Sequence, residues 1–167
     1  MLKRLFTILL SISVVSSTNL LLPPTIRPVA AQNNPLAPYR WQNRLLLVFM
    51  PKVSDERLAS IQARLKEVEC EFQDRDLLLG VFATNYPSRI GNDQISGYDS
   101  TFLRSKYGIK SQQFAVILIG KDGQPKSELS ELPAIDKIFS RIDTMPMRRQ
   151  EMANNPNACE IKTNPNR

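Results

Sequence analysis

The stretch FAVILIGKDGQPK, residues 114–126, constrains the fold of this chain more than any other. Six apolar residues, 114–119, follow one another without a polar break, which is typical of a strand buried on both faces of a sheet. Residues 120–123 then contain the Asp-Gly pair favoured in tight hairpin turns. A polar run over residues 124–130 returns beside the strand, and its proline, Pro125, restricts it to the edge of the sheet. We therefore predict a buried strand with an edge partner, against which helices pack.

Two further apolar runs, Arg44–Met50 and Leu77–Ala83, each predict a buried strand. The segment between them has the spacing of a helix, with Ser54 as its expected N-cap. A strand, a helix and a strand in this order form a βαβ unit, whose strands are expected to be parallel. The apolar residues that recur every three or four positions in the helix are Leu58, Ile61, Leu65, Val68 and Phe72.

The second half of the chain completes an α/β domain. Residues 84–100 read as a long loop, and residues 101–107 as a short helix that ends before Gly108. After the hairpin, a last helix is expected to carry Pro133 in its first turn. The expected architecture is βαβ-α-ββα, with a four-stranded mixed sheet and helices on both faces. The last helix is marked by Leu132, Ile135, Ile138, Phe139 and Ile142.

The beginning of the sequence has the pattern of a cleaved signal peptide. A basic start at residues 1–4 precedes an apolar run, and the small residues 29–31 stand before Gln32. We expect a signal peptide over residues 1–31 and a secreted or periplasmic protein, the alternative being an uncleaved N-terminal anchor. The expected division of the remainder is a lead-in at 32–39, the domain at 40–151 and an Asn- and Pro-rich tail at 152–167.

Composition excludes several classes of function. The chain has no histidine and two cysteines, which removes histidine bases and leaves too few side chains for a zinc site. Cleavage of the leader would remove three basic residues and no acid, so that the formal charge of +6 would become 6 − 3 = +3. This mild excess indicates no nucleic-acid partner, and no membrane partner beyond the signal peptide. We expect no metal and no cofactor.

The order of elements resembles the thioredoxin-like fold. Four motifs resemble more closely a thioredoxin-like domain of unknown function found in bacterial exported proteins and in extracellular proteins of the sushi-repeat and Equarin type. These motifs are residues 44–49, 75–77, 119–123 and 145–148. The resemblance implies a thioredoxin-like domain over approximately residues 39–151.

The chain departs from thioredoxins where their chemistry takes place. Thioredoxins carry a Cys-x-x-Cys pair between the first strand and the first helix, but residues 51–54 read Pro-Lys-Val-Ser. The first turn of that helix, residues 55–58, lacks the reactive cysteine of peroxiredoxins. Gln112 and Gln113 replace the cis-proline before the central strand. Redox chemistry of the thioredoxin type is therefore not expected.

Ligands of open α/β sheets usually bind beyond the carboxyl ends of the parallel strands. At that end, Lys52, Ser54, Arg89 and Gln113 are candidate ligands for a carboxylate or phosphate beside the N-terminus of the first helix. The alternative is that these side chains are solvated polar groups next to an ordinary capped helix.

Other residues are expected to have structural roles at the opposite end of the domain. An exported chain with two cysteines tends to pair them, which predicts a disulfide between Cys70 and Cys159 rather than free thiols. Asp76 and Arg148 are expected to form an ion pair there. Two aromatic residues and two methionines should cover open edges of the core. They are Tyr39, Trp41, Met145 and Met147.

Two functions follow from this sequence. The favoured one is an exported, non-catalytic binding or interaction module for a protein or a small anionic ligand. The alternative is a thiol-dependent oxidoreductase or oxidative-stress protein that uses Cys70 or Cys159.

Overall fold

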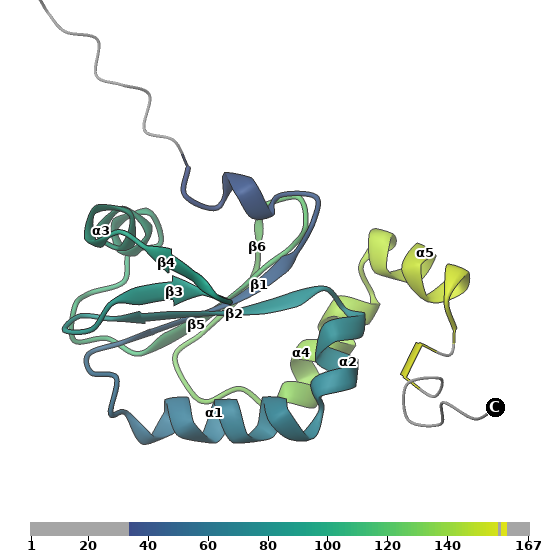
Figure 1. Cartoon of the computed structure of the whole chain (residues 1–167), viewed down its shortest axis with the longest axis horizontal. Helices are drawn as coiled ribbons and strands as arrows, with labels where there is room; N and C mark the ends of the chain where they lie inside the picture. Colours follow the sequence, from purple (N-terminus) through teal and green to yellow (C-terminus); the bar gives the residue numbers. More distant parts are fainter. Residues whose placement is uncertain (1–33, 157, 160–167) are drawn as a thin grey trace, which may run out of the picture. The chain divides into compact units, whose positions relative to one another are not determined.

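A computed structural model describes residues 34–156 and 158–159, which belong to one compact unit, residues 33–167. The segment expected to be a signal peptide, residues 1–31, lies outside the described residues. Within them, six strands form one sheet in the order β4-β3-β2-β1-β5-β6 (Figure 1). The strands are β1 (Arg44–Met50), β2 (Leu77–Ala83), β3 (Ser88–Ile90), β4 (Asp93–Ile95), β5 (Ala115–Ile119) and β6 (Pro125–Leu129).

The pairing of strands agrees with the predicted βαβ unit. β1 and β2 are parallel in the centre of the sheet, with Arg44 opposite Leu77 and Met50 opposite Ala83. β5 runs antiparallel to β1, and β6 antiparallel to β5. The turn between β5 and β6 contains Gly123 with φ of +77°, a conformation that glycine adopts without steric cost.

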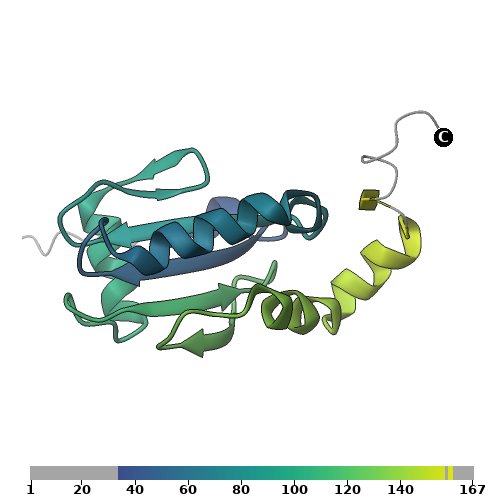
Figure 2. The same cartoon turned by 90° about the horizontal axis from the view of Figure 1, so that it is seen from below.

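Helices cover both faces of the sheet, as Figures 1 and 2 show for α1 and α4 on one face and α3 on the other. Side chains alternate along β1, so that Leu46 and Val48 face α1 and α4, whereas Leu45 and Leu47 belong to the cluster under α3. The helical segments are η1 (Ala37–Tyr39), α1 (Glu56–Glu67), α2 (Glu69–Asp74), α3 (Gly97–Lys106), α4 (Ile135–Asp143) and α5 (Pro146–Asn154).

The predicted fold class is confirmed, but the sheet has six strands rather than four. The segment 84–100, expected to be a loop, contains the β3–β4 hairpin and the first turn of α3. Each of these two strands has three residues, too few for an alternating apolar pattern to be recognised. The helix α3 begins at Gly97, four residues before the expected start.

Several local expectations were wrong. Asp55, rather than Ser54, caps α1, and the expected single helix is interrupted at Val68. Trp41 does not cover the core, because 57% of it is exposed. Its backbone has a φ of +66°, in the left-handed region. Tyr39 is buried as expected, and its hydroxyl donates a hydrogen bond to Asp93 at 2.9 Å.

The helix α5 has no counterpart in the prediction, which placed no helix between the last core helix and the tail expected at 152–167. Its sequence, PMRRQEMAN, has no apolar stripe, and Arg148 is its one buried residue. Met145, just before α5, packs against the core, whereas Met147 is 40% exposed. No helix among the described residues is both long enough and apolar enough to span a bilayer.

Candidate ligand-binding site

The four residues predicted to bind a ligand lie between β1 and α1, on β3 and just before β5. Lys52 and Ser54 are exposed between β1 and α1, and Arg89 is exposed on β3. The side-chain oxygen of Gln113 accepts a hydrogen bond from the backbone N–H of Lys110 at 3.2 Å. None of the four lines the pocket described below, which lies at the other end of β1.

The N-terminus of α1 is already occupied by a carboxylate of the chain itself. Asp55 accepts a hydrogen bond from the backbone N–H of Arg57 at 3.1 Å and pairs with the Arg57 guanidinium at 2.6 Å. The Arg57 hydrogen bond is the main reason that the pKa of Asp55 lies below its usual value, although burial acts in the opposite direction. Because Asp55 is ionised and caps the helix, it competes with any external anion there.

At the opposite end of β1, a buried arginine anchors a network of charges. Arg44 is 1% exposed, and its two terminal nitrogens donate to the carboxylate of Glu151 at 3.0 and 3.1 Å. Lys121 donates to the same carboxylate at 2.8 Å and to Asp76 at 2.7 Å. Arg44 also donates to the backbone carbonyl of Arg75 at 2.8 Å. Residues from β1, the β5–β6 turn and α5 thus share one ion cluster.

A second buried arginine, Arg148, joins three helices. It is 4% exposed and pairs with Asp74, the last residue of α2, and with Asp143, the last residue of α4, at 3.2 Å. The predicted ion pair between Asp76 and Arg148 is wrong, because Asp76 pairs instead with Lys121 in the β5–β6 turn. α5 begins three residues after α4 ends, which places Arg148 beside the ends of the helices. Buried charges are stable only when they are paired in this way.

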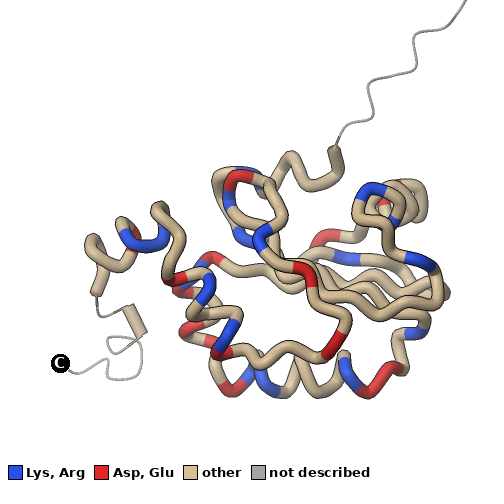
Figure 3. The backbone as a smooth tube through the Cα atoms, turned by 180° about the vertical axis from the view of Figure 1, so that it is seen from behind, with Lys and Arg blue, Asp and Glu red and all other residues tan. Residues whose placement is uncertain are grey.

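The pKa of Glu151 agrees with its place in the network. Burial has the largest effect and acts to raise this pKa, but hydrogen bonds from Arg44 and Lys121 outweigh it and lower the pKa below its usual value. Glu151 is therefore an anion at neutral pH. Figure 3 shows acidic and basic residues interspersed around α2, α4 and α5, as this network requires.

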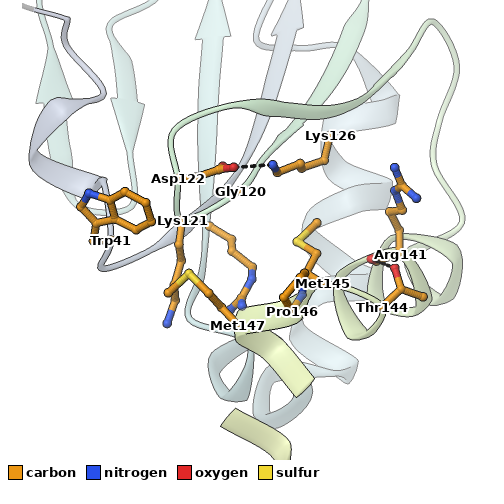
Figure 4. Close-up of a pocket in the computed structure, with 11 residues that line it drawn as sticks. Trp41, Gly120, Lys121, Asp122, Lys126, Arg141, Thr144, Met145, Pro146 and Met147 are labelled. Atoms are coloured by element: carbon orange, nitrogen blue, oxygen red, sulfur yellow. Dashed lines mark hydrogen bonds and ion pairs between the residues drawn. The ribbon is translucent and has the colours of Figure 1, made fainter. Parts of the chain in front are cut away.

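A pocket of about 490 Å³ opens beside the network. In Figure 4, Trp41 and Arg141 stand on opposite sides of it, and an ion pair of 2.5 Å joins Asp122 to Lys126 above it. Its volume lies in the range of about 300–1,000 Å³ that small-molecule sites occupy. The pocket is lined by Trp41, Arg44, Gly120, Lys121, Asp122, Lys126, Arg141, Thr144, Met145, Pro146 and Met147.

Cys70 and Cys159 form a disulfide, with Cα atoms 5.6 Å apart, as predicted. Cys70 lies in α2, and Cys159 follows α5. The bond therefore closes the C-terminal segment onto the end of the domain that holds the charge network. Neither cysteine is near residues 51–54, because α1 separates that segment from α2 by 12 residues, or roughly 18 Å of helix.

Comparison with known proteins identifies the domain. Residues 35–151 match the profile of the family described as "Domain of unknown function (DUF4174)". The chain belongs to the DUF4174 family. The DUF4174 domain includes Arg44, Arg75 and Arg148 of the network, the pocket and Glu151, its last residue.

One relative of the DUF4174 chain is coiled-coil domain-containing protein 80 of Danio rerio. The two are 27% identical over 136 residues, which is 72% of this chain and 16% of the relative. The chain therefore corresponds to about one sixth of that protein.

Two solved structures resemble the DUF4174 chain. The reduced 2-Cys peroxiredoxin of Plasmodium vivax matches with a TM-score of 0.50 and 17% identity, over 69% of this chain and 84% of the peroxiredoxin. A thioredoxin-fold protein of Helicobacter pylori matches with a TM-score of 0.44 and 13% identity, over 74% and 86% of the two chains. At this identity the peroxiredoxin match shows a thioredoxin-like fold and nothing about chemistry.

Sequence reasoning noticed the motifs that build this site but missed the pocket. Arg44, Lys121 and Arg148 lie in motifs that were interpreted as marks of the fold, and Glu151 and Arg141 were not singled out. The clustering of these motifs at one end of the sheet was the available signal. Among the described residues, no group of three His, Cys, Asp or Glu side chains is placed to hold a metal ion.

Proposed function

We propose that this chain is an exported, non-catalytic binding module, whose ligand occupies the pocket lined by Trp41, Lys121 and Arg141. The single observation that carries the proposal is the place of that pocket. It lies at the start of β1, whereas a thioredoxin performs its chemistry after the end of that strand. Seven residues of β1, or about 20 Å, separate the two positions.

The residues at the redox position support a non-catalytic role. Residues 51–54 contain no thiol, and the chain has no histidine that could activate a nucleophile. Cys70 and Cys159 are bonded to each other at the other end of β1, where they brace α2 and the segment after α5. A structural disulfide and a leader-like N-terminal segment both favour an oxidising compartment outside the cytoplasm.

Redox assays test this proposal. The purified protein should reduce insulin disulfides and consume peroxide no faster than a blank, because no activated thiol is available. A thioredoxin and a peroxiredoxin serve as positive controls in the same assays. Turnover that disappears in Cys70→Ser or Cys159→Ser would contradict the proposal and would establish the alternative, a thiol-dependent oxidoreductase.

A further inference from the structure

The pocket has an apolar wall that is open to solvent. Trp41 is 57% exposed and Met147 is 40% exposed, and Met145 and Pro146 also line the cavity. Trp41 is held at the rim, because its backbone N–H donates to the carbonyl of Lys121 at 2.6 Å. Aromatic and thioether side chains that leave this much surface uncovered in a concave site suit an apolar ligand.

The charges around the pocket leave one cation without a counter-ion. Lys126 pairs with Asp122, while Arg44 and Lys121 share Glu151. No ion pair or hydrogen bond to the Arg141 guanidinium is found within residues 34–156 and 158–159. Pocket and network together hold six cations and five acids, so that their net charge is 6 − 5 = +1. The cations are Arg44, Arg75, Lys121, Lys126, Arg141 and Arg148, and the acids are Asp74, Asp76, Asp122, Asp143 and Glu151.

A buried donor at the pocket also lacks a partner. Arg44 lines the pocket, and its Nε is buried without a hydrogen-bond acceptor among the described residues. Buried N–H groups are normally paired, and such an unpaired donor costs free energy. The charge of Arg44 itself is already compensated by Glu151, so Arg44 adds no second site for an anion.

We infer that the pocket binds a small molecule with a single anionic group and an apolar or aromatic body. The anionic group pairs with Arg141, which supplies the uncompensated charge, and the body covers Trp41 and Met147. This inference rests on the proposed function, because it names the ligand class of the same pocket. The volume of about 490 Å³ accommodates a molecule of this kind.

A matched pair of fluorescent probes tests the ligand class. The probe 8-anilino-1-naphthalenesulfonate carries one sulfonate, and N-phenyl-1-naphthylamine has the same aromatic body without it. The wild-type protein should bind the sulfonate more tightly than the neutral amine. Because Trp41 is the single tryptophan of the chain, energy transfer from it to the bound probe reports binding next to the pocket.

Three variants separate the two parts of the site. Arg141→Ala should weaken sulfonate binding about fivefold and leave the amine unchanged, because one charge interaction is lost. Trp41→Ala should weaken both probes, measured by their own fluorescence. Arg89→Ala, an exposed arginine on β3, is the control and should change neither.

Equal binding of the two probes, an unaltered sulfonate affinity in Arg141→Ala, or no binding of either probe would overturn this inference. A larger loss in Arg89→Ala than in Arg141→Ala would also overturn it. These outcomes leave the redox assays untouched. Redox turnover would instead overturn the proposed function, whichever probe binds.

Discussion

Arg148 occupies a position that would ordinarily hold an apolar side chain. Its guanidinium is buried where α2, α4 and α5 meet, with Asp74 and Asp143 as partners. Arg149, the next residue, is exposed. Two consecutive arginines thus differ in environment, because Arg148 is buried and Arg149 is in contact with solvent. The difference follows from the helix, which turns consecutive side chains to different sides.

We predict that Arg148→Met destabilises the protein by about 3 kcal/mol, because it leaves the Asp74 carboxylate partly buried without its cation and leaves Asp143 with Arg75 alone. Arg149→Met is the matched control and should change stability by less than about 0.5 kcal/mol. Urea denaturation followed by circular dichroism measures both. Similar changes in the two variants would contradict a structural role for the Arg148 network.

At the scale of elements, α5 is held by charges and a covalent bond rather than by apolar packing. Its one buried residue is Arg148, and Glu151 joins it to Arg44 and Lys121. Cys159 follows the C-terminal end of α5 and is bonded to Cys70, which lies 89 residues earlier in the chain. A helix of this composition would be marginal if it were isolated in water.

Replacing both cysteines, Cys70→Ser with Cys159→Ser, should leave the sheet folded but lower the free energy of unfolding. The chain-entropy model gives about 4–5 kcal/mol as an upper value for a loop of this length. Urea denaturation measures the loss, and limited proteolysis should cut the segment after Asp143 sooner than in the wild type. An unchanged midpoint together with an unchanged cleavage pattern would show that the disulfide does not hold α5.

At the scale of the whole molecule, the fold and its use are separable. The thioredoxin-like sheet presents two ends, and in this chain the charged residues of four sequence motifs gather at the end that thioredoxins do not use for chemistry. The same kind of sheet can thereby carry a pocket at the end opposite to the redox position of thioredoxins.

The compartment can be checked on the whole chain. Protein recovered from the exporting cell should begin near Gln32, because residues 29–31 have the small side chains that a signal peptidase requires. N-terminal sequencing and the mass of the non-reduced protein measure cleavage and thiol state together. Protein that begins mainly at Met1 would end the proposal of a cleaved leader.

The sequence alone determined the central strands and the helices that pack on one face of them. β1, β2 and β5 are nearly unbroken apolar runs, and α4 has apolar residues at helical spacing. Such patterns are local consequences of burial, so they can be recognised without the fold. The disulfide also followed from the cysteine count, because two cysteines allow a single intramolecular pairing.

Only the tertiary structure decided the partners of the charged residues and therefore the pocket. Arg44 and Glu151 are 107 residues apart, and nothing in either local sequence indicates that they meet. Asp74 rather than Asp76 pairs with Arg148, because the ends of α2 and α4 converge on α5. An ion pair depends on the distance between side chains in the folded chain, which periodicity does not encode.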